Sequence, residues 1–256
     1  MKQFCFTVDD NVRVFKELTE GDYGSIFDHP YLGMFKRLHE KHGLKIQLNL
    51  FYESDGFDLS RMTDRYRNEW HAVSDWLKLS FHSRLENVKP YEYSGYEDVF
   101  SDWQSVHREI LRFASEDSLA KTTTVHYCLA TAAGLDALKD NGVKGLLGLY
   151  GSPDAPRSSY QTSKADGDRI REGKLVFCEG ITYTGIDVVM NLYSKEENLS
   201  QIDALLQRER IKVMIHEQYF YPDYRRYQPD FEEKIDAVFK TLSENHFHSA
   251  FFEEWL

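Results

Sequence analysis

The chain has 256 residues, a length that suits a single large α/β domain, and barrels of this kind commonly need about 250 residues. Its formal net charge is −11 and it has no basic stripe, which argues against partners such as nucleic acid or an anionic membrane surface. Apolar residues make up 41% of the chain, enough for a full core, yet no apolar run approaches the ~20 residues that span a bilayer.

The cysteines do not indicate disulfide bonds. There are three of them, Cys5, Cys128 and Cys178, and no two are spaced as CxxC. An odd number without such spacing gives no disulfide framework. No charged and apolar leader precedes the first predicted strand, so we expect a cytoplasmic protein.

Strand and helix patterns alternate from the N-terminus onward. The first strand is predicted over 2–10, with Phe4, Phe6 and Val8 on one side, and a short helix over 11–20 follows. Further strands are predicted at 44–53, 76–83, 122–130, 143–151, 174–185, 186–194, 211–220 and 249–255. Further helices are predicted at 59–76, 96–115, 134–142, 199–210 with Ser200 as its cap, and 231–246. The polar stretch 152–173 is predicted to be a long loop.

Repeated strand–helix units predict a parallel sheet with helices on its faces. No GxGxxG or Walker-type glycine pattern follows any strand, which leaves a dinucleotide or nucleoside-triphosphate fold without a motif. We therefore predict an α/β fold, a (β/α) barrel of parallel strands that is distorted or seven-stranded, formed by residues 1–256 as a single domain.

Reactive residues of such barrels lie at the C-terminal ends of the strands. Here those ends carry the polar residues Asp9, Asp10, His82, Glu86, His126, His216 and Glu217. One Asp with two His, or Asp with His and Glu, can hold a divalent ion while leaving a position for water. A second acid can take a proton from that water, and a further His can protonate the leaving group. The pattern thus indicates metal-assisted hydrolysis.

The stretch "TVDD" at 7–10 resembles the Thr-Phe-Asp-Asp motif of the polysaccharide deacetylases, the NodB-homology family of carbohydrate esterases. The resemblance implies that Asp9 is the catalytic base and Asp10 a metal ligand. "IKVMIHEQ" at 211–218 is similar to the family's last motif, an apolar strand that ends in a histidine, and implies that His216 is the general acid. No Gly follows the Asp pair, and the Arg-x-Pro-Tyr motif is missing.

The third metal ligand stays open between two residues. "HSRLE" at 82–86 resembles the family's His-Ser/Thr-x-x-His motif, but Glu86 stands where the second His belongs. His82 and Glu86 would then both bind the metal, although Ser83 and Glu86 also suit a capping box at a helix start. Alternatively His126 supplies the ligand, as in the YdjC-type deacetylases of the same barrel superfamily.

The resemblance implies a metal-dependent hydrolase that removes an acyl (acetyl) group from an N-acetylated sugar or polysaccharide. Zinc is the expected metal, with cobalt, iron or manganese as alternatives. The aromatic stretches 91–98 and 217–227 are candidates for lining a carbohydrate cleft. Two other functions remain open: an inactive barrel that binds carbohydrate or a protein partner, and a glycoside hydrolase that pairs Glu217 with Glu179 or Glu253.

Overall fold

The strand at the start of the chain, β1 (Gln3–Asn11), lies inside the larger of two sheets. A computed structural model, which describes residues 1–89 and 91–256, shows β1 paired in parallel with β2 (Ile46–Ser54) and with β10 (Arg210–His216). This sheet has seven strands and the other has four.

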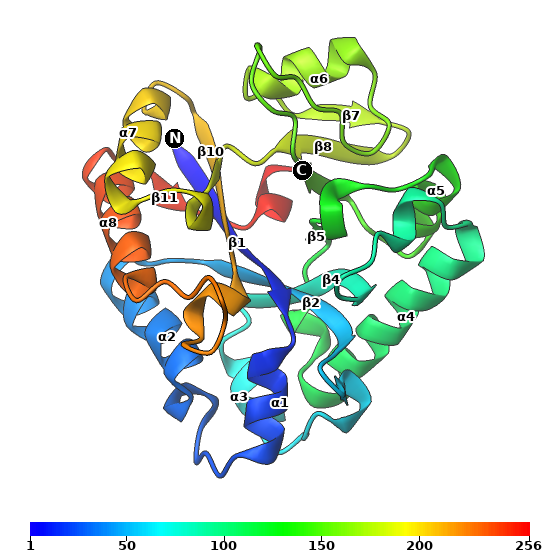
Figure 1. Cartoon of the computed structure of the whole chain (residues 1–256), viewed down its shortest axis with the longest axis vertical. Helices are drawn as coiled ribbons and strands as arrows, with labels where there is room; N and C mark the ends of the chain where they lie inside the picture. Colours follow the sequence, from blue (N-terminus) through cyan, green and yellow to red (C-terminus); the bar gives the residue numbers. More distant parts are fainter.

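The larger sheet also contains β3 (Phe57–Asp58), β4 (Leu77–Leu85), β9 (Val188–Val189) and β11 (His248–Ser249), and the smaller contains β5 (Thr122–Thr123), β6 (Gly145–Gly148), β7 (Val176–Cys178) and β8 (Ile181–Gly185). The helices are α1 (Arg13–Glu20), α2 (Pro30–His42), α3 (Arg67–Ala72), α4 (Tyr96–Phe113), α5 (Ala132–Asp140), α6 (Lys164–Arg171), α7 (Lys195–Leu205) and α8 (Phe231–Glu244). Figure 1 shows α2, α7 and α8 on one flank of the strands and α4 and α5 on the other.

The two sheets close into a distorted barrel. A parallel bridge between Leu79 and Leu119 joins β4 to the chain just before β5. On the other side β8 leads into β9, and the Asp187 amide donates to the Lys212 carbonyl of β10 at 2.8 Å. The parallel strands therefore follow one another around the barrel as β1, β2, β4, β5, β6, β8 with β9, and β10. The predicted α/β barrel is confirmed.

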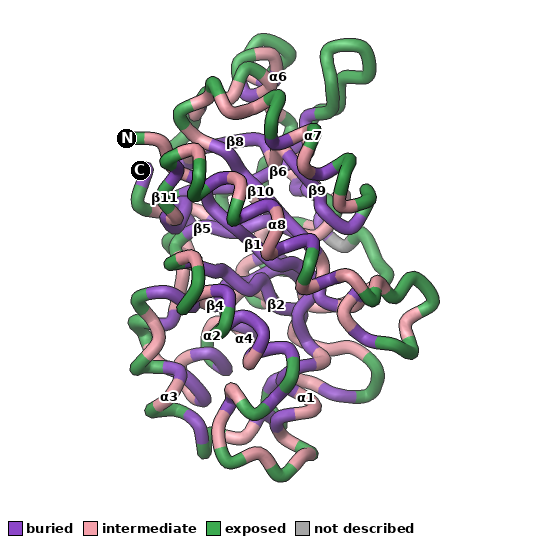
Figure 2. Tube along the Cα trace, turned by 90° about the vertical axis from the view of Figure 1, so that its left-hand side faces the viewer, coloured by how far each residue is buried: buried purple, intermediate pink, exposed green. Residues whose placement is uncertain are grey.

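The apolar side of β1 faces the helices. Phe4 stacks on Phe239 of α8 with ring centroids 4.9 Å apart, and Phe6 meets Phe35 of α2 edge-on at 6.2 Å. Side chains alternate along a strand, so the intervening residues of β1 face the barrel interior. The strands run through the buried middle of the molecule, as Figure 2 shows.

That interior is polar. Buried polar residues on β1, β2, β4, β5 and β10 include Thr7, Asp9, Gln47, Asn49, Ser80, His82, Thr122 and Lys212. Barrels of this class are more often filled with bulky branched apolar residues. The apolar core of this protein therefore lies mainly between strands and helices, and the inside of the barrel is left for hydrogen-bonding groups.

A buried histidine ties α1 to the start of α2. His29 is 1% exposed, and its Nε2 lies 2.7 Å from Glu17 of α1. Glu17 also accepts from Arg13 at 2.8 Å. Partial burial opposes ionisation of Glu17, but the hydrogen bonds from His29 and Arg13 outweigh it and hold the pKa of Glu17 below its usual value.

We expect Glu17→Gln to lower the free energy of unfolding by about 1 kcal/mol at pH 7. Because the folded-state pKa is depressed, this contribution is present above the carboxyl's usual pKa and is lost as the pH falls through the lower folded value. Urea unfolding of both proteins at pH 7 and pH 4 measures it. A difference that grows toward low pH would contradict this pairing.

Two segments differ from their predicted secondary structure because of local contacts. Residues 59–76 do not form one helix: the Arg112 guanidinium donates to the carbonyls of Leu59 and Met62, which holds a 3-10 turn there, and α3 begins only at Arg67. The predicted loop 152–173 contains α6, which Ser163 caps by accepting from the Asp166 amide.

Other boundaries also move. The helix predicted at 199–210 begins earlier, since Ser194 and Glu197 form its capping box and Ser200 lies inside it. Helix α2 was not predicted at all. The strands predicted at 122–130, 186–194, 211–220 and 249–255 are shorter, and each continues into a 3-10 turn.

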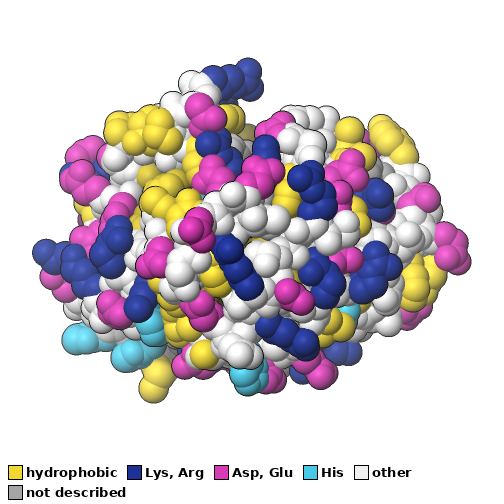
Figure 3. Space-filling view, turned by 90° about the horizontal axis from the view of Figure 1, so that it is seen from below, with side chains coloured by type: hydrophobic (Ala, Val, Ile, Leu, Met, Phe, Trp, Pro, Cys, Tyr) yellow, Lys and Arg dark blue, Asp and Glu magenta, His cyan; other side chains and the backbone are white. Residues whose placement is uncertain are grey.

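Charges of both signs are interspersed on the face seen in Figure 3, without a continuous basic stripe there. Among the described helices, none is both long and apolar enough to cross a membrane.

Candidate metal centre

A bulge at the end of β1 brings two adjacent carboxylates to one side. The pairing of β1 with β2 changes register between Val8 and Asn11, and Asp10 has a left-handed φ of 66°. In a regular strand Asp9 and Asp10 would point to opposite faces. Here both line the same cavity, which explains why two like charges follow each other at this strand end.

His82 occupies an irregular position of β4. The pairing with β2 passes from Phe81 to Ser83, so His82 is the extra residue. Its Nδ1 donates to the Thr124 carbonyl, which places the proton on that nitrogen and leaves Nε2 as the ligand atom. Nε2 lies 3.0 Å from Asp10 Oδ1.

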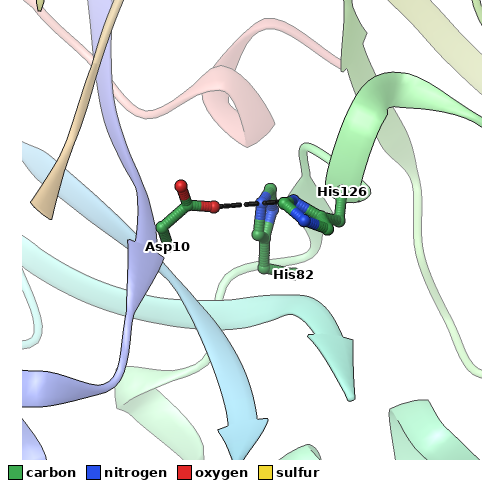
Figure 4. Close-up of side chains that lie close together, drawn as sticks. All are labelled: Asp10, His82 and His126. Atoms are coloured by element: carbon green, nitrogen blue, oxygen red, sulfur yellow. Dashed lines mark hydrogen bonds and ion pairs between the residues drawn. The ribbon is translucent and has the colours of Figure 1, made fainter. Parts of the chain in front are cut away.

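His126 follows β5 in a tight turn. Tyr127 and Cys128 have left-handed φ values of 60° and 57°, which ends the strand and turns the chain across the barrel mouth. His126 Nδ1 lies 3.0 Å from His82 Nε2 and 3.5 Å from Asp10 Oδ1 (Figure 4). The strand predicted to continue to residue 130 is thus replaced by the turn that delivers this imidazole.

The three donor atoms form a compact triangle of a size that fits a divalent cation. Asp10 Oδ1, His82 Nε2 and His126 Nδ1 are separated by 3.0, 3.0 and 3.5 Å. Tetrahedral ligands at about 2.0–2.1 Å from a metal lie about 3.3 Å apart. All three side chains are largely buried, at 8%, 3% and 11% exposure.

The protonation states of Asp10, His82 and His126 also suit coordination of a metal ion. Burial lowers the pKa of His126 to about 3, with the nearby His82 adding to the effect, so His126 is neutral. Burial opposes the charge of Asp10, but the hydrogen bond from His82 holds the pKa of Asp10 well below its usual range. Burial likewise opposes the charge of His82, but Asp9 and Asp10 raise its pKa, so a metal would displace a proton there.

Glu86, the alternative ligand, lies outside this triangle. It is half-buried and accepts a hydrogen bond from Ser54 of β2. Burial raises the pKa of Glu86, and the nearby Asp10 and Asp55 raise it further. Among the described residues, the cluster of ligand atoms contains Asp10, His82 and His126 and not Glu86.

The residues predicted as base and acid face each other on neighbouring strands. Asp9 of β1 and His216 of β10 are register partners, and both line the cavity. Asp9 is 1% exposed, and burial raises its pKa against the opposing influence of His82 and His216. Asn191 Oδ1 lies 2.8 Å from Nδ1 of His216, so that nitrogen donates and Nε2 remains for proton exchange.

Three amides, which sequence reasoning missed, orient the carboxylates. Asn49 Nδ2 donates to Asp9 Oδ1 at 2.6 Å, and Gln47 Nε2 donates to Asn49 Oδ1 at 2.8 Å. Gln218 Nε2 donates to Asp10 Oδ2 at 2.7 Å. The signal for the first two was present in "IQLNL", where amides alternate with apolar residues in a strand.

Glu217 has a structural position. It is 1% exposed and accepts from the amides of Val12, Arg13 and Val14 at 2.8 to 3.0 Å, and from the Tyr221 hydroxyl at 3.2 Å. Burial raises its pKa to about 7, a value that would suit a general acid. However, its oxygens are occupied by these donors, and it does not line the described cavity.

The two acids suggested as its partners lie elsewhere. Glu253 binds Lys78 Nζ at 2.7 Å and the Lys121 amide, beside the amino ends of β4 and β5. Glu179 is exposed in the turn between β7 and β8. The structure therefore does not bring Glu217 together with Glu179 or Glu253, the two pairs considered for a glycoside hydrolase.

The cavity at the barrel mouth has a volume of about 1190 Å³. From the aromatic stretch 217–227, Tyr219 and Tyr224 line it. In the stretch 91–98, Tyr91 packs instead against Phe81 in the core, and no described residue of this stretch lines the cavity. The volume of the cavity suits a ligand larger than one sugar ring.

A comparison with solved structures supports this architecture. The chain aligns over 99% of its length with 89% of a family 4 acetyl xylan esterase from Clostridium thermocellum in complex with a cobalt ion, at 11% identity and a TM-score of 0.54. The fold is that of the polysaccharide deacetylases. This confirms the deacetylase fold that the sequence motifs implied. An identity this low shows the fold and does not show the activity.

Two further structures share this fold. A 4-α-glucanotransferase from Thermococcus litoralis matches 99% of this chain at 13% identity and a TM-score of 0.66, and this chain spans 40% of its length. A proposed cellobiose-phosphate cleavage protein from Enterococcus faecalis matches with 11% identity, 99% and 98% coverage and a TM-score of 0.53. No protein-family model and no curated protein matches the sequence.

Proposed function

We propose that this protein is a metal-dependent deacetylase that removes an acetyl group from an N-acetylated sugar. The observation that carries the proposal is the triangle of ligand atoms from Asp10, His82 and His126 at the mouth of a large cavity. It draws further support from Asp9 and His216, an acid and an imidazole that line the same cavity without belonging to the triangle.

Each side chain has a part in the reaction. A divalent ion held by the triangle would polarise the acetyl carbonyl and acidify a water molecule. Asp9, with one oxygen held by Asn49, takes the proton from that water at its other oxygen. His216, held through Nδ1 by Asn191, gives a proton from Nε2 to the departing amine.

Zinc is the metal that this donor set favours. Two imidazole nitrogens and one carboxylate, with a position left for water, are typical of catalytic zinc. Cobalt, iron and manganese accept similar donors, so elemental analysis of the purified protein distinguishes them.

The test has two parts, metal content and acetate release from acetylated chito-oligosaccharides. We expect about one equivalent of metal and acetate release that chelation removes. Asp9→Asn should keep the metal and lower kcat by about 10² to 10⁴-fold, since it removes the base and little volume. A protein that takes up no zinc, cobalt, iron or manganese would rule out this mechanism and favour an inactive carbohydrate-binding barrel.

Asn49 tests how the base is positioned. We expect Asn49→Leu to lower kcat by about 10 to 100-fold with unchanged metal content, because Asp9 loses the side-chain hydrogen bond from Asn49 while the volume is kept. Gln47→Met, one residue further along the same chain of amides, should have a smaller effect. Equal loss of metal and activity in Asn49→Leu would instead indicate a general disturbance of the site.

A further inference from the structure

The cavity has an unusual set of arginines. Arg157, Arg225 and Arg226 all line it, and within the described part of the chain none of them has a carboxylate at ion-pair distance. All three arginines are exposed. Elsewhere guanidinium groups are commonly paired, for example Arg112 with Glu109 at 2.6 Å. Three uncompensated cations around one cavity are notable in a chain of net charge −11.

The charges are separated around the barrel mouth. The acidic residues Asp10, Asp55 and Glu86 belong to the ends of β1, β2 and β4, which are neighbours in the barrel order. Arg157 follows β6, while Arg225 and its neighbour follow β10. The cavity therefore has an acidic arc at β1, β2 and β4 and a basic arc from β6 to β10, and the two arcs meet where β10 pairs with β1.

Among the described residues that line the basic arc, the one carboxylate, that of Asp187, is already paired. Asp187, just before β9, lies 2.6 Å from Arg208 and 2.8 Å from the buried Lys212. It leaves no charge to pair with the cavity-lining arginines. The three guanidinium groups therefore remain available for bidentate hydrogen bonds to an anion.

Aromatic side chains stand on the rim between the two arcs. Tyr127, beside the metal centre, is 45% exposed, and Tyr193, after β9, is 39% exposed. Such rings stack on sugar faces, so they alone would be sufficient to bind a neutral sugar. The arginines add recognition of a negative group at a distance from the acetyl group.

We propose, on the basis of the deacetylase function above, that the substrate is an N-acetylated sugar carrying an anionic substituent, a phosphate or a carboxylate. Arg157, Arg225 and Arg226 hold this substituent, and the acetyl group is thereby directed to Asp10, His82 and His126 in the same cavity.

The test is a binding measurement on the metal-loaded protein by calorimetry. The probes are N-acetylglucosamine, its 6-phosphate, and N-acetylmuramic acid, which carries a carboxylate. We expect at least one of the anionic sugars to bind at least about tenfold more tightly than the neutral one, with a preference that weakens as salt is added. The stronger of the two identifies the substituent.

Variants decide whether the arginines are responsible. Arg157→Gln and the double variant Arg225→Gln/Arg226→Gln should each remove about tenfold of the preference and leave binding of the neutral sugar unchanged. The matched control is Arg169→Gln, an exposed arginine on α6 outside the cavity. Equal binding of all probes, or a preference that survives in the arginine variants because the anion sits on the metal, would overturn the proposal.

Acetate release from the same probes separates this inference from the proposed function. An arginine-dependent preference without acetate release would contradict the deacetylase activity and leave the anion site in place. Acetate release at equal rates from neutral and anionic sugars would support the activity and contradict the anion site.

Discussion

Replacing His126 with alanine is expected to weaken binding of the divalent metal by more than about 100-fold and to abolish acetate release. Removing a residue that only hydrogen-bonds to a metal ligand typically lowers metal affinity about 10 to 100-fold. His126 supplies one of the three candidate donor atoms itself, so its loss should cost more. Without it, His82 is left in its hydrogen bond with Asp10; burial opposes the charge of His82, but Asp9 and Asp10 raise its pKa, so a proton competes with the metal there. Elemental analysis after dialysis and calorimetric titration with zinc measure the effect.

Two further variants serve as controls for His126→Ala. Glu86→Ala should keep the metal, because Glu86 is hydrogen-bonded to Ser54 and lies outside the cluster of ligand atoms. His216→Ala should also keep it while acetate release falls. If Glu86→Ala lost the metal and His126→Ala retained it, the ligand set drawn from the structure would be wrong.

Glu217→Ala is expected to destabilise the fold by about 3 kcal/mol at pH 5.5. The substitution leaves the amides of Val12, Arg13 and Val14 unpaired at the start of α1, and each buried donor without a partner costs about 1–3 kcal/mol. Burial raises the pKa of Glu217 to about 7, so its contribution is complete below the carboxyl's usual pKa and declines as the pH rises through 7. The loss should therefore be smaller at pH 8.

Urea unfolding at the two pH values measures this. Tyr221→Phe is the matched control, because it removes only one of the four donors to Glu217, the one at 3.2 Å, and should cost less than about 1.5 kcal/mol. A loss for Glu217→Ala no greater than that of Tyr221→Phe would show that α1 does not depend on this carboxylate.

The end of β10 therefore has three different tasks in three consecutive residues. His216 lines the cavity opposite Asp9, Glu217 holds the start of α1 just after the Asp pair, and Gln218 donates to Asp10. A shift of this strand end would disturb Asp9, Asp10 and the start of α1 together. The stretch "IHEQ" thus contributes a side chain to the cavity and also holds the neighbouring chain segments in place.

The sequence by itself determined the barrel and much of the candidate site. Alternation of apolar residues is a local property, since it follows from the two-residue period of a strand, and it located β1, β2, β4 and β10. Because the carboxyl ends of parallel strands meet at one end of a barrel, the positions of Asp9, Asp10, His82 and His216 followed from that pattern.

Only the tertiary structure decided which third side chain joins Asp10 and His82. The sequence left Glu86, four residues after His82, and His126, 44 residues after it, as equal alternatives. Their distances to the metal centre depend on where β4 and β5 end, and β5 ends early because the chain turns with left-handed φ angles at Tyr127 and Cys128. Contacts of this kind arise from the packing of distant segments, which no local pattern encodes.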